Sequence, residues 1–284
     1  MKKIISIVVA LIGLITLASC TKTEKSDKIQ VYTSIYPMYD FAKQIGGEKA
    51  EVHILCPPGQ EPHDYEPTAK DIALLSDADV FIYNGMGMEH WVDSVTSALD
   101  GVVSLNTSDS AEIITDNHDP HLWLNPQNAF MQMSAISRSL CKADPENASY
   151  YEARLNDAKV KIDTLIADFN TAAAQFQSND IVVSHEAYSN LCDTFCLNQI
   201  AINGIHNDED PSPGRMAEIE KLIAEKNIRH IFTESLGTSS VVVAIAKDTD
   251  CEILVLDPFE GNSEMEDYFT VMYKNLDALK KALN

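Results

Sequence analysis

Short apolar runs alternate with amphipathic segments along most of the chain. Runs of four to eight apolar residues bounded by turn residues are typical of strands, and apolar positions three or four residues apart are typical of helices. In the first half they predict strands at 28–34, 52–55 and 80–83 and helices at 39–45, 69–75 and 90–99. In the second half they predict strands at 181–183, 199–202, 230–233 and 253–256 and helices at 187–195, 213–226 and 239–248. Strands that alternate with helices favour parallel pairing, so the pattern predicts an α/β fold with parallel-rich sheets flanked by helices.

The longest helical pattern lies between the two halves. Asp144, Pro145 and Glu146 supply an N-cap, an N1 proline and an acidic first turn. Apolar residues then recur every three or four positions up to Phe176, without a glycine or a proline. This predicts one helix over about 146–176, on the order of 45 Å long. A coiled-coil dimerisation helix is the alternative, but the short apolar stripe with several alanines favours a rigid helix that links two domains.

These elements predict two α/β domains joined by one long spine helix. The expected N-terminal domain covers 29–143, the spine helix lies within 144–177, and the C-terminal domain covers 178–284. A helix of this length could run the full height of two stacked domains.

The first 28 residues predict export. Two lysines, an apolar stretch over 4–17 and the small residues before Cys20 form a secretory signal peptide, residues 1–19. The apolar stretch is too short to span a bilayer comfortably. The tetrapeptide LASC resembles the bacterial lipobox, which predicts lipidation of Cys20 as the mature N-terminus. Residues 20–28 are then a polar tether, and the mature protein is lipid-anchored in the periplasm or at the outer cell surface.

Net charge limits the classes of binding partner, and the cysteine count limits the possible disulfides. The formal net charge is −22, and no basic patch offers a surface for nucleic acid or anionic lipid. Beyond Cys20 the cysteine count is odd, so these residues cannot all pair internally. Cys192 and Cys196 lie four residues apart, a spacing that could supply half of a metal site. No second pair supports such a site, which favours core residues or one disulfide.

Four potential metal ligands lie where an apolar run breaks into a turn. They are His63, His121, His185 and Asp257, separated by 58, 64 and 72 residues. In open parallel sheets, ligands bind beyond the carboxyl ends of the strands. Three imidazoles and a carboxylate match a tetrahedral transition-metal site. Two ligands from each domain place that site in the interdomain cleft.

A series of motifs resembles a known family over the whole mature chain. These are PPGQEPHDYEPT, YNGMGMEHWVD, DPHLWLNP, VVSHEAY, INGIHNDEDPSPGRMAEI, IFTESL and LVLDPF. They resemble the metal-binding component of bacterial zinc and manganese ABC importers, the ZnuA-like and TroA-like solute-binding lipoproteins. The resemblance implies a monomer that delivers a divalent metal to an ABC permease with a separate ATPase subunit. By position it implies the same four ligands, His63, His121, His185 and Asp257.

The third ligand bears on the choice of metal. An imidazole from His185 favours Zn²⁺, whereas a carboxylate there would favour Mn²⁺. Zinc-specific relatives often carry a histidine-rich loop before the DPHxW segment, and here His118 is the one extra histidine in that region. Manganese therefore stays open as the alternative. Glu61 and His118 are accessory candidates, as an oxygen ligand and as a residue met by the entering metal.

A zinc hydrolase and a surface adhesin are the competing classes. Three histidines with a metal-bound water form a hydrolytic site. However, the HExxH motif is missing around His185, and Asp257 as fourth ligand would leave no position for water. We therefore expect no enzymatic activity. Adhesion as a second activity stays open.

Overall fold

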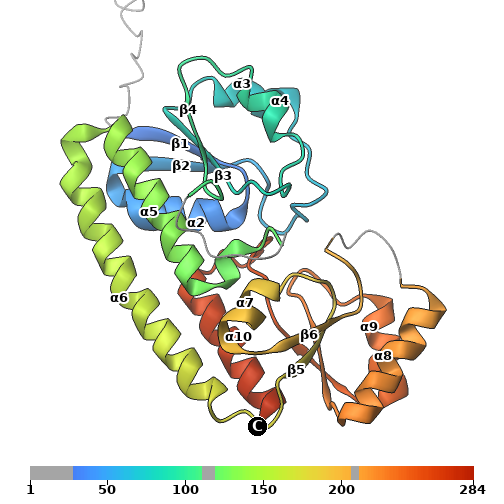
Figure 1. Ribbon diagram of the computed structural model, residues 1–284. Coiled ribbons are helices and arrows are strands. Elements are labelled where there is room, and N and C mark those ends of the chain that lie inside the picture. The colour runs from blue at the N-terminus through green and yellow to red at the C-terminus, as the bar shows by residue number, and fades with distance from the viewer. Residues whose placement is uncertain (1–27, 111–118, 206–210) are drawn as a thin grey trace, which may run out of the picture.

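The computed structural model describes residues 28–110, 119–205 and 211–284 (Figure 1). The predicted signal peptide, the predicted lipidation site Cys20 and nearly all of the predicted tether lie outside the described residues. The accessory candidate His118 lies outside them as well.

Two four-stranded parallel sheets form the framework, and they share one topology. The first has the order β2-β1-β3-β4 and the second the order β6-β5-β7-β8. The first sheet consists of β1 (Ile29–Thr33), β2 (Ala50–Ile54), β3 (Val80–Tyr83) and β4 (Val103–Asn106). The second consists of β5 (Asp180–Val183), β6 (Asn198–Ala201), β7 (His230–Thr233) and β8 (Glu252–Val255). The predicted α/β class with two parallel sheets is confirmed, although β4 was not predicted.

Helices cover both sheets (Figure 1). They are α2 (Tyr36–Gly46), α3 (Ala69–Leu75), α4 (Val92–Thr96), α5 (Pro126–Ala143), α6 (Ala148–Ala173), α7 (Ser189–Phe195), α8 (Pro213–Lys226), α9 (Ser240–Thr249) and α10 (Tyr268–Leu283). Of these, α5 and α10 were not predicted. Both begin at a side-chain cap, Asn125 for α5 and Asp267 for α10. Among the described residues, no helix is both long and apolar enough to cross a bilayer.

The predicted spine helix is α6, preceded by a short 3₁₀ turn over Pro145–Asn147. One side of α6 is buried through Tyr151, Ile162, Leu165 and Phe169. This side packs against α2 and α5 of the first half and against α7 and α10 of the second half. Figure 1 shows α6 running alongside both halves. The apolar stripe is thus buried against other helices of the same chain, as expected of a spine helix.

One apolar cluster continues from the first sheet across to α10. The ring of Phe259 packs edge-on against Tyr36 at 5.3 Å and against Tyr268 at 5.5 Å. Trp123 Nε1 donates a hydrogen bond to the carbonyl of Pro258 at 2.7 Å, and Tyr268 Oη donates to the carbonyl of Trp123 at 2.8 Å. Because these contacts join the two halves, the loops that carry them are held firmly.

All five described cysteines are free thiols. Cys192 is buried on α7, and Cys196 is exposed at the left-handed C-cap of that helix. The sequence left two interpretations open for this pair, core residues or one disulfide. The structure shows that the disulfide is not formed.

We expect Leu165→Ala to lower the free energy of unfolding by about 2–5 kcal/mol, because Leu165 is fully buried on α6 and its truncation leaves a cavity. Urea denaturation of the metal-free protein measures this change. Val160→Ala on the same helix is the matched control, since Val160 is 67% exposed and its truncation should change stability by less than about 0.5 kcal/mol. Equal effects of the two substitutions would contradict the packing described for α6.

Candidate metal site

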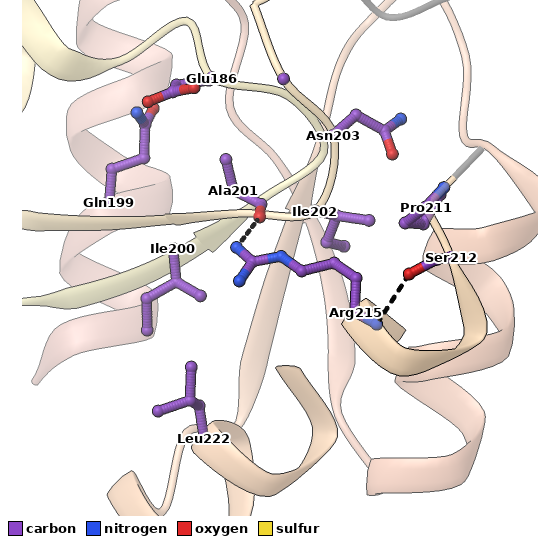
Figure 2. Close-up of a pocket in the computed structure, with 11 residues that line it drawn as sticks. Glu186, Gln199, Ile200, Ala201, Ile202, Asn203, Pro211, Ser212, Arg215 and Leu222 are labelled. Atoms are coloured by element: carbon purple, nitrogen blue, oxygen red, sulfur yellow. Dashed lines mark hydrogen bonds between the residues drawn. The ribbon is translucent and has the colours of Figure 1, made fainter. Parts of the chain in front are cut away.

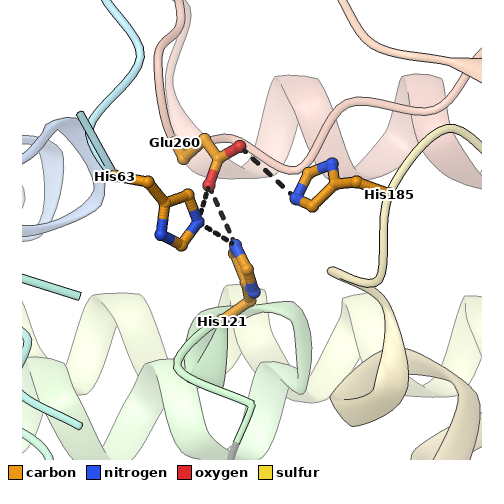
Figure 3. A group of neighbouring side chains, drawn as sticks. All are labelled: His63, His121, His185 and Glu260. Carbon is orange, nitrogen blue, oxygen red and sulfur yellow. Dashed lines mark hydrogen bonds and ion pairs between the residues drawn. The ribbon is translucent and has the colours of Figure 1, made fainter. Parts of the chain in front are cut away.

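Four buried side chains from four separate loops converge between the two halves (Figure 3). His63 lies in the loop after β2, and His121 immediately precedes a 3₁₀ turn over Leu122–Leu124. His185 follows β5, and Glu260 lies in the loop after β8. Each sheet therefore contributes loops from the carboxyl ends of its strands, where parallel sheets usually bind ligands.

The spacing of the ligand atoms suits one small cation. Oε2 of Glu260 lies 2.9 Å from Nε2 of His121 and 3.5 Å from Nε2 of His63, and these two nitrogens are 3.2 Å apart. Nε2 of His185 lies 3.8 Å from Oε1 of Glu260. A tetrahedral shell with bonds of about 2.0 Å places its ligand atoms about 3.3 Å apart. These separations, from 2.9 to 3.8 Å, are therefore close to those between the ligands of a tetrahedral zinc site.

Two atoms of this group point to a ligand from outside the chain. Nε2 of His185 and Oε1 of Glu260 are buried without a hydrogen-bond partner among the described residues. A buried polar atom without a partner carries a substantial desolvation cost. A cation bound to both atoms removes that cost, so the residues present fit a metal.

The electrostatics of the group favour positive charge. Burial alone would lower the pKa of His121, but the charges of Glu260 and Asp119 and their hydrogen bonds to the ring raise it to about 10. Burial alone would raise the pKa of Glu260, whereas His121, His63 and His185 lower it well below its usual range. The pKa of His185 is also raised, because Glu234 and Glu260 outweigh the effect of burial. Near neutral pH the metal-free site therefore holds an ionised Glu260 beside a protonated His121.

The structure does not bring Asp257 into this group, contrary to the sequence prediction. Oδ1 of Asp257 accepts a hydrogen bond from the backbone N–H of Phe259 at 2.7 Å. The backbone of Asp257 exchanges two hydrogen bonds with the side chain of Asn275 on α10. Asp257 therefore shapes the turn after β8. The turn directs the next carboxylate of the loop, that of Glu260, to the histidines.

The sequence offered one signal for Glu260. Within LVLDPFEGN, the first acidic residue directly follows the predicted strand and is the predicted ligand, while the second lies three residues further on. An aspartate directly after a strand and before a proline is well placed for a turn, which leaves the later glutamate free to act as a ligand.

Glu61 belongs to a second group of carboxylates beside the first. Its carboxylate lies within 4.8 Å of Glu234 and Glu260. Burial and the charge of Glu260 raise the pKa of Glu61 to about 7. Glu61 is half-buried, and the structure places this accessory candidate next to Glu260 of the histidine group.

A separate pocket lies along the edge strand β6 and the start of α8 (Figure 2). Its lining includes Glu186, Gln199 and Arg215, and it contains none of the four converging residues. The guanidinium of Arg215 donates to the carbonyl of Ala201 at 2.8 Å, so its charge is used in holding α8 to the sheet.

Comparison with known proteins agrees with this architecture. The High-affinity zinc uptake system protein ZnuA of Bacillus subtilis is 33% identical over 283 residues, which cover 91% of this chain and 89% of that protein. The Zinc-binding protein AdcA of Streptococcus pyogenes is 32% identical over 99% of this chain, which spans only 61% of that longer protein. The crystal structure of the Zn(II)-bound ZnuA-like domain of Streptococcus pneumoniae AdcA superposes with a TM-score of 0.80. It is 31% identical and covers 90% of this chain and 99% of that domain.

The model of one protein family, described as zinc-uptake complex component A, periplasmic, matches residues 31–282. This match covers the spine helix, all four converging side chains and all of both sheets except the first two residues of β1. The chain therefore belongs to the family of zinc-uptake complex component A.

Proposed function

We propose that the protein captures Zn²⁺ outside the cytoplasmic membrane and delivers it to an ABC importer. The observation that carries this proposal is the convergence of His63, His121, His185 and Glu260 in a buried group with tetrahedral spacing. Its relatives named for zinc uptake and zinc binding support the same cargo.

The donor set favours zinc over manganese. Three imidazole nitrogens and one carboxylate oxygen suit Zn²⁺, whereas Mn²⁺ prefers oxygen donors and a higher coordination number. The fourth ligand proposed here is Glu260 in place of the predicted Asp257. Both residues are carboxylates, so the donor set is unchanged. Manganese is thus the less favoured cargo.

The same donor set favours transport over hydrolysis. A hydrolytic zinc site keeps one position open for water, but four protein ligands fill a tetrahedral shell. Glu260 contributes the fourth ligand from the second half, so the cation is enclosed by both halves at once. An enclosed cation is suited to capture and transfer.

Delivery requires a membrane-bound partner. We propose that export and lipidation at Cys20 keep the protein, as a monomer, near a permease whose separate ATPase subunit drives import. The halves 29–143 and 178–284, linked by 144–177, would enclose the cation between them. Binding then favours the closed arrangement through its differential affinity for the two states.

We expect Glu260→Gln and His121→Ala each to weaken zinc binding by more than about 100-fold, since loss of a direct ligand should exceed the 10- to 100-fold typical of outer partners. Competition titration against a chromophoric zinc chelator measures the dissociation constants. Asp257→Asn is the matched control from the same loop, because its carboxylate faces Phe259 and not the cation. Its affinity should stay close to that of the wild type. A large loss for Asp257→Asn with none for Glu260→Gln would overturn the assignment of the fourth ligand.

Zinc affinity should rise with pH. The proton on Nε2 of His121 must leave before the nitrogen can bind metal, and its pKa in the metal-free protein is about 10. Below that pKa, proton competition from His121 alone lowers the apparent affinity about tenfold for each unit that the pH falls. The raised pKa of His185 acts in the same direction. Calorimetry in buffers of different ionisation enthalpy should show release of protons when zinc binds at pH 7. A zinc affinity that does not change between about pH 6 and pH 8 would contradict the charge state described above.

A further inference from the structure

Two of the three histidines have a buried carboxylate on the ring nitrogen that faces away from the other ligands. Nδ1 of His121 lies 2.6 Å from Oδ1 of Asp119, and Nδ1 of His185 lies 2.5 Å from Oε1 of Glu234. Asp119 is 3% exposed and Glu234 is 6% exposed. An ionised carboxylate only accepts hydrogen bonds, so each of these contacts requires a hydrogen on Nδ1. Nε2 is thereby left as the nitrogen that can bind a cation, and Figure 3 shows both of these nitrogens turned towards Glu260.

Asp119 also reaches from the first half of the chain to the second. Its Oδ1 accepts a further hydrogen bond from the backbone N–H of His121 at 2.9 Å. Its Oδ2 accepts from the backbone N–H of Ser189 at 3.1 Å, and its carbonyl accepts from the side chain of Asn190 at 3.3 Å. Ser189 begins α7, four residues after His185. One carboxylate therefore joins the loop of His121 to the loop of His185.

Glu234 holds its histidine from within the second half. The residue follows β7, and the single oxygen Oε1 accepts from both the hydroxyl of Ser184 and Nδ1 of His185. Ser184 and His185 lie together at the end of β5. This carboxylate orients one ring, whereas Asp119 orients a ring and also links two loops.

We propose that Asp119 and Glu234 are positioning residues that orient Nε2 of His121 and of His185 before zinc arrives. Asp119 has the additional role of setting the separation of the two loops that carry these histidines. The inference rests on the proposed zinc capture and extends it to two residues outside the ligand set. Outer partners of this kind usually change metal affinity by about 10- to 100-fold when they are altered.

The two carboxylates should respond differently to conversion into amides. Both oxygens of Asp119 accept from N–H groups, so the amide of Asp119→Asn must place its own N–H against one of these donors. In Glu234→Gln, the carbonyl oxygen can still accept from both Ser184 and His185. We therefore expect Asp119→Asn to weaken zinc binding by about 10- to 100-fold, with a much smaller loss for Glu234→Gln. Glu234→Ala, which removes the acceptor, should fall in the same range as Asp119→Asn.

The experiment combines zinc competition titration with the visible absorption spectrum of the Co²⁺-loaded protein, which reports the coordination geometry. Wild-type protein should give an intense tetrahedral spectrum. Asp119→Asn and Glu234→Ala should give altered or weaker spectra, and Glu234→Gln should retain the wild-type spectrum. Leu165→Ala is the control for lost stability, because it lowers stability on α6 away from the ligands and should leave both spectrum and affinity unchanged. Thermal melts of all variants establish that each one is folded.

The outcomes separate this inference from the proposed function. Wild-type protein that binds neither zinc nor cobalt would refute both. Wild-type binding together with an unaltered spectrum and affinity in Asp119→Asn and Glu234→Ala would refute the positioning roles alone. A spectrum altered equally in Leu165→Ala would also refute them, because the change would then follow from stability and not from the carboxylates.

Discussion

The apolar contact between the two halves is the constraint on which the site depends. Four ligand atoms must stay within a few ångströms of one another although they come from four loops on two separate sheets. All four groups are ionisable side chains that lose most of their hydration, so small displacements are costly. The packing of Phe259 between Tyr36 and Tyr268, with the hydrogen bond from Trp123 to Pro258, fixes the loop of Glu260 against the first half. Ligand geometry thus follows from core packing.

Neutralisation of the buried carboxylate of Glu260 is a second constraint on the site. A buried carboxylate needs a positive partner, and the metal-free site supplies one by protonating His121. When zinc binds, the cation replaces that proton and the pair remains neutralised. The site therefore supplies a positive partner for Glu260 both without metal and with it. Its affinity must be linked to pH for the same reason, since zinc and the proton compete for one nitrogen.

The sequence predicted the parts of the fold and site that depend on local pattern. Buried parallel strands and the α6 stripe were recognised because their apolar periodicity is strong, and three histidines were found because they follow or precede such runs. Glu260 was missed because the turn made by Asp257 is decided by hydrogen bonds to Phe259 and Asn275, the latter 18 residues away. The helix α10 was within reach of the sequence, because Asp267 supplies an N-cap and apolar residues follow it at helical spacing. The roles of Asp119 and Glu234 depend on contacts across 49 to 70 residues, which spacing alone does not reveal.

Contacts close to the site tie the two halves together in addition to the core packing. The spine helix α6 packs against both halves, and α10 adds a further connection, because its first N–H donates to Asp40 of α2 at 3.2 Å. Beside the site, the N–H of Gly59 donates to the carbonyl of Gly261 at 2.5 Å, which joins the loop of His63 to the loop of Glu260. A Cβ at Gly261 would lie 2.4 Å from the side-chain end of Leu236 and 3.1 Å from the carbonyl of Gln60, so any larger residue there would have to displace its neighbours. The positions of His63 and Glu260 relative to each other are thus fixed by contacts between their own loops as well as by the core behind them.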